Sequence, residues 1–250
     1  MGLEGRLALV TGGSRGIGRG IALGLAEDGA DVLVNYRRDE ESAHETVAEI
    51  EALGRRAQAV QGSVDDHEQL DRMVGECLGG LGAPCIVVHN AGIASRGQSV
   101  EDTDPAELQR VMAVHALGPH YLTKILIPHL REHERADVVM ISSVATLGFS
   151  ANGAPYSMAK SAMEALAKTL AKELRPDGIR VNIVAPGLVE TEMGTRLVRA
   201  TRGVEIGELH EKSPFGRVCQ PEDIAGAVRF FVSNNGSYVT GEKLNVWGGG

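Results

Sequence analysis

The 250-residue chain has few cysteines, few aromatic residues and no long hydrophobic run. Cys77, Cys85 and Cys219 are far apart and form no C-x-x-C pair, so neither a disulfide framework nor a metal site is expected. No apolar stretch approaches the ~18 residues that a membrane-spanning helix needs. Acidic residues outnumber basic ones by 33 to 25, and the net charge of −8 makes nucleic acid and anionic membranes poor partners.

The N-terminal stretch MGLEGRLALVTGG lacks a charged segment followed by a long apolar run, so we expect no signal peptide. Arg6 also spoils a myristoylation motif. Together with the sparse cysteines, these features predict a cytoplasmic protein.

Glycine, by contrast, is abundant, and its 32 residues suit an α/β fold with tight turns. Mostly continuous Val, Ile and Leu runs, typical of parallel strands covered on both faces, alternate with helical stretches. The pattern predicts one α/β domain, residues 1–250, built on a doubly wound sheet of βαβ units. The strands are expected at 6–11, 31–36, 56–60, 85–90, 137–142, 180–185 and 243–247, and the helices at 17–28, 40–53, 66–79, 104–131, 156–174 and 221–232.

Residues 194–214 break this alternation after the strand at 180–185. Ligands bind at the carboxyl ends of strands in such sheets, and a loop of this length is uncommon without a role. We therefore expect a substrate-loop insertion there; a disordered surface insertion is the alternative.

The stretch TGGSRGIG (11–18) joins the first expected strand to the first helix. Its glycines allow a sharp turn and let backbone approach a pyrophosphate at the helix N-terminus, where amide dipoles favour negative charge. A glycine pattern alone is weak evidence, but this position between strand and helix supports nucleotide binding. The residues expected at the nucleotide are Gly12, Ser14, Arg15, Gly16, Ile17 and Gly18.

The second expected strand ends in the letters NYRRDE. In such folds an acid at this point holds the 2′-hydroxyl of NAD, whereas arginine suits the 2′-phosphate of NADP. Here an asparagine and Tyr36 stand in its place, Arg37 and Arg38 follow, and Arg15 can reach the same region. NADP is therefore favoured over NAD; in the alternative, the two arginines point to solvent and Asp39 serves NAD.

The sequence resembles the short-chain dehydrogenase/reductase family over almost its whole length, from Arg6 to Gly249. The resemblance implies a Rossmann-type, seven-stranded parallel sheet with helices on both faces. It also implies hydride transfer between a nicotinamide and an alcohol or carbonyl. The motifs that carry it are TGGSRGIG (11–18), HNAG (89–92), ISS (141–143), YSMAK (156–160), APGLVET (185–191) and YVTGEKLNVWGG (238–249).

The same resemblance assigns further cofactor contacts. It implies that Asn90, Ala91 and Gly92 line the adenine-ribose side and that the backbone of Val64 contacts the adenine. Ser63 replaces the aspartate usual beside it, which weakens the expected adenine contact. The residues implied at the nicotinamide are Pro186, Gly187, Val189 and Thr191.

Three residues form the expected catalytic group. Ser143 precedes Tyr156 by thirteen residues, the family's spacing for its catalytic serine, and Lys160 follows one helical turn later. In a reduction, hydride reaches the carbonyl carbon, Ser143 donates a hydrogen bond to the oxygen, and Tyr156 donates a proton. The resemblance implies that Lys160 also holds the ribose hydroxyls of the nicotinamide.

Lys160 is expected to lower the pKa of Tyr156. At an effective dielectric of ~20 and a separation of ~5 Å, Coulomb attraction is roughly 3 kcal/mol, which corresponds to about two pKa units. The pKa of the phenol is thus expected to fall from near ~10 toward ~8.

His115 stands where the family often has an asparagine whose backbone carbonyl holds a water beside the lysine. A backbone role survives the change of side chain. His115 is a catalytic candidate because an imidazole titrating near ~6.5 is able to relay protons, and His115→Asn is then expected to alter the pH profile. The alternative is that His115 only fills space.

The expected helix at 156–174 carries one narrow polar stripe and an otherwise apolar circumference. Such a helix packs on two sides, one of which can be a second subunit. The resemblance implies a tetramer built through this helix and its neighbour, so we expect a homotetramer or homodimer; a wide core face in a monomer is the alternative.

These observations predict an NADP-dependent oxidoreductase acting on a ketone or secondary alcohol. The runner-up is a 3-oxoacyl-acyl-carrier-protein reductase, disfavoured because Glu134 and Asp177 stand where carrier-binding relatives present arginines. A non-catalytic nucleotide-sensing module is a further alternative, but such modules typically lose the tyrosine or the lysine.

Overall fold

The computed structural model describes residues 2–249 and contains one seven-stranded parallel sheet in the order β3-β2-β1-β4-β5-β6-β7. The predicted doubly wound, Rossmann-type fold is confirmed. The strands are β1 (Leu7–Val10), β2 (Asp31–Tyr36), β3 (Ala57–Gln61), β4 (Ile86–His89), β5 (Ala136–Ile141), β6 (Ile179–Pro186) and β7 (Lys243–Val246).

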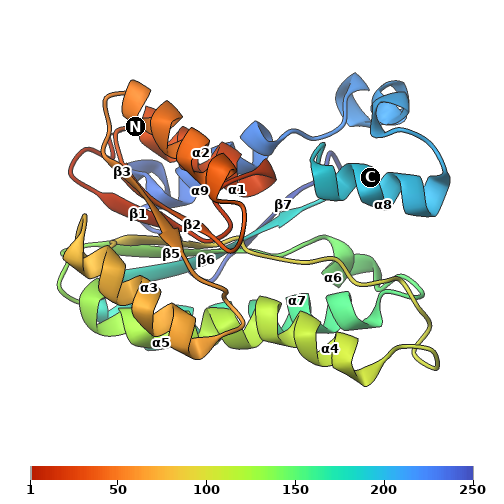
Figure 1. Cartoon of the computed structure of the whole chain (residues 1–250), viewed down its shortest axis with the longest axis horizontal. Helices are drawn as coiled ribbons and strands as arrows, with labels where there is room; N and C mark the ends of the chain where they lie inside the picture. Colours follow the sequence, from red (N-terminus) through yellow and green to blue (C-terminus); the bar gives the residue numbers. More distant parts are fainter. Residues whose placement is uncertain (1, 250) are drawn as a thin grey trace.

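Helices cover both faces of the sheet, α1, α2 and α9 on one side and α3, α4, α5 and α7 on the other (Figure 1). Within residues 2–249, no helix is both long and apolar enough to cross a membrane. The α-helices are α1 (Gly16–Glu27), α2 (Glu40–Ala52), α3 (His67–Gly79), α4 (Pro105–Met112), α5 (Gly118–Leu130), α6 (Ala145–Gly148), α7 (Ala154–Glu173), α8 (Glu192–Arg202) and α9 (Pro221–Val232). The other helical turns are the π turn η1 (Ala113–Leu117) and the 3-10 turns η2 (Arg175–Asp177), η3 (Ile206–Lys212), η4 (Pro214–Gly216) and η5 (Asn234–Gly236).

The core consists of two apolar layers, one on each face of the sheet. Side chains alternate along a strand, so Val10 of β1 joins the cluster under α1 and α9, whereas Leu9 joins the cluster over α5 and α7. Strands buried on both faces explain why the sequence shows continuous apolar runs.

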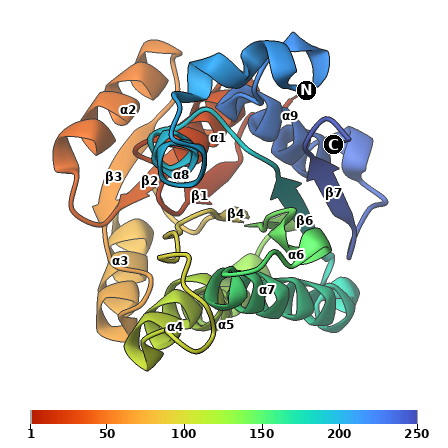
Figure 2. The ribbon, with the colours of Figure 1, turned by 90° about the vertical axis from the view of Figure 1, so that its right-hand side faces the viewer.

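Two predicted elements differ from expectation. The single helix expected at 104–131 is divided by the π turn η1, which contains His115. The segment 194–214, expected as a loop, is largely helical because Val198, Ile206 and Leu209 form a small apolar cluster of their own with Val218. It lies at the same end of the sheet as α6, and Figure 2 looks onto that end.

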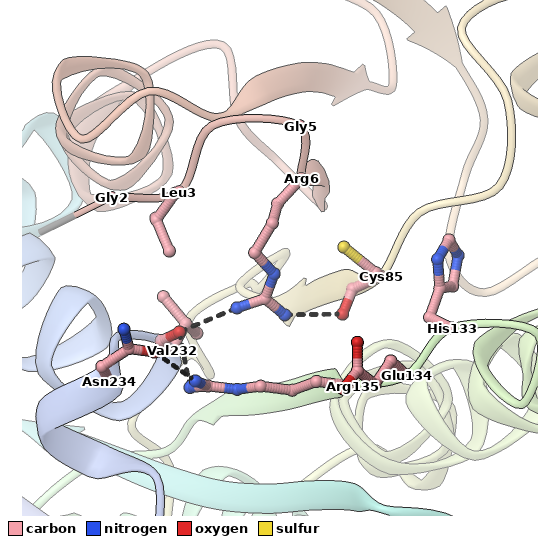
Figure 3. A pocket seen from close by; sticks show the side chains of 10 residues that line it. All are labelled: Gly2, Leu3, Gly5, Arg6, Cys85, His133, Glu134, Arg135, Val232 and Asn234. Atoms are coloured by element: carbon pink, nitrogen blue, oxygen red, sulfur yellow. Dashed lines mark hydrogen bonds between the residues drawn. The ribbon is translucent and has the colours of Figure 1, made fainter.

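The amino edge of the sheet, at the opposite end, is tied to α9 by arginines. Asp137 at the start of β5 pairs with Arg6, Arg135 and Arg180. Arg6 and Arg135 also each donate to the Val232 carbonyl at 2.8 Å, at the C-terminal end of α9, where cations satisfy the last carbonyls of a helix. Figure 3 shows both arginines beside a pocket of about 350 Å³.

Candidate active site

The glycine turn after β1 is shaped for close approach by a ligand. Gly12 and Gly16 have φ angles of +62° and +53°, which side chains disfavour. A Cβ at Gly18 would overlap the carbonyl oxygen of Gly12, so the helix and the turn meet backbone to backbone. Asn90, at the end of β4, donates to the carbonyls of Thr11 and Gly12 at 2.9 and 3.1 Å and fixes the turn.

The N-terminus of α1 is open. No side chain caps it, whereas α2, α3, α4 and α8 are capped by Asp39, Asp66, Asp104 and Thr191. Uncapped first-turn N–H groups and the positive end of the helix dipole suit a phosphate. A nucleotide pyrophosphate therefore fits this turn.

The end of β2 has two buried side chains followed by two exposed arginines. Asn35 is buried, accepts from the Gly12 N–H at 3.2 Å and donates to the Gly62 carbonyl at 3.0 Å, so it braces the glycine turn. Tyr36 is buried beside it, and Arg37 is exposed with its neighbour at position 38. Basic side chains thus border the place where a ribose of a bound nucleotide would lie.

Arg15 crosses from the glycine turn to α8. Its guanidinium lies 3.2 Å from a Glu192 carboxylate oxygen and 4.0 Å from Asp39. The methyl group of Thr191 would lie 3.3 Å from a Cβ at Gly16, so the start of α8 packs against the turn. Figure 2 shows α8 in front of this β1–α1 connection.

The other residues predicted at the cofactor lie at the same edge of the sheet. Ser63 and Val64 follow β3 and are buried, and the Ser63 hydroxyl donates to Asp65. Pro186 ends β6 and accepts from the Val144 N–H at 3.0 Å, next to Ser143. Of the remaining ones, Ile17 lies in the first turn of α1. The others lie on the turns that follow β1, β4 and β6: Ser14, Ala91, Gly92, Gly187 and Val189.

The predicted catalytic group converges at the carboxyl ends of β5 and β6. Tyr156 and Lys160 are one turn apart on α7, with the lysine Nζ 5.7 Å from the centre of the tyrosine ring. Ser143 follows β5, and its hydroxyl hydrogen-bonds to Tyr156. The Ser143 Oγ also accepts from the Ala145 N–H at 3.2 Å, so its one proton is available either to Tyr156 or to a bound carbonyl oxygen.

The predicted fall in the pKa of Tyr156 is wrong in direction. Burial raises the pKa of the phenol above 10, and the hydrogen bond from Ser143 only partly opposes this. Lys160 does not reverse the effect because its Nζ donates to the Ile141 carbonyl at 2.6 Å and is itself buried. Burial lowers the pKa of Lys160 to about 7, so its charge is only partial at neutral pH.

His115 joins this group, but not as a titrating acid. Its ring meets the Tyr156 ring edge-on, with centroids 5.3 Å apart, and its Nε2 lies 2.8 Å from the Ile93 carbonyl. Burial and the nearby charge of Lys160 lower the pKa of the imidazole to about 3. The expected titration near ~6.5 is therefore wrong, because a buried histidine cannot easily hold a second proton.

Sequence reasoning missed two acids near this edge. Glu192 pairs with Arg15, and Glu164 accepts from Ser142, the residue before Ser143. The position of Glu164 could have been inferred from helical spacing, since it lies two turns after Tyr156 on the same side of α7. No local sequence pattern indicates the role of Glu192, because its partner Arg15 is 177 residues away in the chain.

Comparisons with known proteins agree with this geometry. A family model described as enoyl-(acyl carrier protein) reductase matches residues 12–250. The chain is 35% identical to a 3-oxoacyl-[acyl-carrier-protein] reductase of Synechocystis, covering 99% of the chain and 97% of the relative. It is 34% identical to the human dehydrogenase/reductase SDR family member 4, covering 99% of the chain and 88% of that protein.

Solved structures give the same result. The chain is 32% identical to a 3-ketoacyl-(acyl-carrier-protein) reductase from Brucella melitensis complexed with NADH, with a TM-score of 0.88 and coverage of 99% and 98%. It is also 32% identical to a blue fluorescent protein from a metagenomic library in complex with NADPH, with a TM-score of 0.90 and coverage of 100% and 99%. The chain therefore belongs to the short-chain dehydrogenase/reductase family of oxidoreductases, which use a nicotinamide cofactor.

Proposed function

We propose that the protein is an NADP(H)-dependent reductase of ketones that also oxidises the corresponding secondary alcohols. The observation that carries this proposal is the meeting of Ser143, Tyr156 and Lys160 at the edge of the sheet that also holds the open glycine turn. Hydroxyl donors and a lysine beside a nucleotide site suit proton transfer to a carbonyl oxygen.

The chain's own groups have distinct tasks in this reaction. A bound nicotinamide supplies the hydride. Ser143 donates a hydrogen bond to the carbonyl oxygen, because its Oγ already accepts from a backbone N–H. The neutral phenol of Tyr156 donates the proton, and a protonated Lys160 stabilises the phenolate that remains. His115 keeps the Tyr156 ring in place through its edge-on contact.

NADP is favoured over NAD by the side chains around β2. Arg37 and Arg38 are exposed at its end, and Arg15 faces the same region. Asp39, the alternative acid for NAD, is engaged as the cap of α2, where its carboxylate accepts from the Ser42 N–H at 3.2 Å. Arginines suit a 2′-phosphate, whereas the acid that would serve a 2′-hydroxyl is already used as a helix cap.

The substrate is proposed to be a free small ketone or a coenzyme-A thioester rather than a carrier-linked chain. Arg131 pairs with Asp177 at 2.8 Å, and Arg135 is bound to the end of α9. The charge of each arginine is therefore partly offset by its neighbours, which weakens the attraction for an acidic carrier protein. The carrier-linked reaction remains the second candidate because of the similarity to 3-oxoacyl reductases.

A homotetramer or homodimer is proposed from an apolar surface on the α7 side. Met158 on α7 is 52% exposed and Leu117, at the end of the π turn, is 57% exposed. Burial of such side chains by a second copy is favourable. Sedimentation tests this, and a monomer at all concentrations would contradict it.

Consumption of NADPH and NADH against a panel of ketones, sugars, steroids and acyl thioesters tests the function. We expect turnover with at least one ketone and a preference for NADPH. A preference for NADH would overturn the cofactor assignment. NADPH binding without turnover on any carbonyl would instead favour the nucleotide-sensing alternative.

A further inference from the structure

Glu164 gathers three side chains on one carboxylate oxygen. Its Oε1 accepts from the Ser142 hydroxyl at 2.5 Å and from the Thr146 hydroxyl at 2.8 Å, and it lies 2.8 Å from the Nζ of Lys243. Lys243, on β7, also donates to Thr146 at 2.5 Å. The side chains of Glu164 and Lys243 are each 14% exposed, so this ion pair is largely withdrawn from water. A buried pair needs additional hydrogen bonds, and this one has them.

The residues held by Glu164 flank the catalytic serine. Ser142 immediately precedes Ser143, and Thr146 closes the turn after it, with its N–H donating to the Ser143 carbonyl at 3.3 Å. Glu164 therefore anchors both ends of the turn that presents the Ser143 hydroxyl. Such an anchor keeps a hydrogen-bond donor aimed at one point, which is what stabilisation of a developing oxyanion requires.

Glu164 also faces Lys160, one turn earlier on α7. The other titratable groups around Lys160 are Tyr156 on α7 and His115 on the π turn, and Lys243 on β7 contacts Glu164. Burial lowers the pKa of Lys160 to about 7, and the charge of Glu164 opposes that decrease. Among these groups, Glu164 is the only carboxylate and hence the source of negative charge for a buried ammonium.

We propose that Glu164 is a positioning residue for hydride transfer, which with Lys243 fixes the Ser143 turn and supplies the negative charge that balances Lys160. The proposal rests on the proposed carbonyl reduction, because that reaction is its assay. A wild-type protein without turnover would count against the proposed function. An active wild type with an unaltered Glu164 variant counts against this inference alone.

The test is the pH dependence of kcat/KM for ketone reduction by four proteins. Glu164→Gln keeps the shape and the acceptor oxygen but removes the charge. Lys160 then loses its proton more easily. The fall of kcat/KM with rising pH, called the alkaline limb, is therefore expected at a pH lower by about one unit. Lys243→Gln keeps the carboxylate, so its limb stays at or above the wild-type position. Glu173→Gln, at the exposed end of α7, is the matched control and leaves the limb unchanged.

Two results would overturn the proposal. One is that kcat/KM of Glu164→Gln falls on the alkaline side at the same pH as that of the wild type. The other is an equal downward movement in Lys243→Gln, which would indicate disturbed packing rather than lost charge. Thermal unfolding and NADPH titration show that each variant is folded. Should Glu164→Gln not fold, the double variant Glu164→Gln, Lys243→Gln replaces the ion pair by two amides. Its limb is expected to move in the same direction by a smaller amount, because a positive charge is lost together with the carboxylate.

A second readout concerns the Ser143 turn. Glu164→Leu removes the acceptor as well as the charge and is expected to lower kcat at least tenfold below that of Glu164→Gln, with KM little changed. Equal kcat values in the two variants would show that the turn does not depend on this anchor.

Discussion

The two edges of the sheet use charge in opposite ways. At the amino edge, the buried carboxylate of Asp137 is surrounded by Arg6, Arg135 and Arg180, whose guanidinium groups also bind backbone carbonyls. At the carboxyl edge, Lys160 is buried with no carboxylate in direct contact, and the start of α1 is uncapped. One edge therefore stabilises the fold, whereas the other keeps polar groups ready for a ligand.

Burial acts on protonation at both edges. At the amino edge it raises the pKa of the Asp137 carboxyl and lowers that of Arg180, although the arginines around Asp137 oppose the first shift. Near the carboxyl edge, burial raises the pKa of Tyr156 and lowers that of Lys160 to about 7. Both shifts disfavour charge in the resting site, so the phenol is a neutral proton donor at physiological pH. Reduction is accordingly expected to slow as pH rises through the pKa of Lys160.

The largest effect on stability is expected at Asp137. Asp137→Ala leaves three guanidinium groups facing one another and should lower the free energy of unfolding by about 3–5 kcal/mol, while kcat/KM at low temperature is kept. Urea unfolding measures the first quantity. The control, Asp177→Ala, breaks an exposed pair with Arg131 and should cost at most about 1 kcal/mol. Equal losses in the two variants would show that the buried arginine cluster contributes no more to stability than an exposed ion pair.

A methyl group at Gly18 should damage the carboxyl edge instead. Gly18→Ala forces the start of α1 away from the Gly12 carbonyl, and we expect the affinity for NADPH to fall at least tenfold. Fluorescence titration provides the measurement. Gly226→Ala, on α9 with open space around it, is the matched control and should keep full affinity. An unchanged affinity in Gly18→Ala would place the pyrophosphate elsewhere.

A smaller effect is expected at Glu192. Its carboxylate competes with a 2′-phosphate for Arg15, so Glu192→Gln should bind NADPH two- to fivefold more tightly and NADH as before, an effect of about 0.4–1 kcal/mol. Added salt should reduce the gain. Glu222→Gln, exposed on α9, controls for net charge. Equal gains in affinity for NADPH and NADH would show that Arg15 does not contact the 2′-phosphate.

The smallest change is expected at His115. Its pKa of about 3 makes the imidazole neutral throughout the working range, so His115→Asn should keep kcat/KM within about threefold and leave the pH profile unaltered above pH ~5. Steady-state kinetics across pH decide this. Loss of a limb near pH ~6.5 in the variant would restore the titrating role that the sequence alone indicated.

Much of this site could be predicted from the sequence because its signals are local. The apolar runs gave the strands, and the spacing of Ser143, Tyr156 and Lys160 predicted their meeting, which the structure confirms. Helix α8 was missed because its one buried apolar side chain, Val198, packs on residues outside the helix.

Other features depend on burial or on distant partners, which no local pattern shows. The direction of the pKa shift at Tyr156 depends on how deeply α7 is covered. The contact of Glu164 with Lys243 joins α7 to β7 across 79 residues. Asn35 occupies the expected place of a ribose-binding acid, yet its side chain turns inward to the glycine turn and to β3.

The most direct test of the account is Tyr156→Phe, which removes one hydroxyl and leaves the ring against His115. With a ketone that the wild type reduces, kcat/KM should fall about 10²–10⁴-fold, as expected for loss of a general acid. NADPH affinity and the free energy of unfolding should stay at wild-type values, because the phenol belongs to the reactive edge and not to the stabilising one. Turnover that survives in Tyr156→Phe would contradict the assignment of Tyr156 as the proton donor.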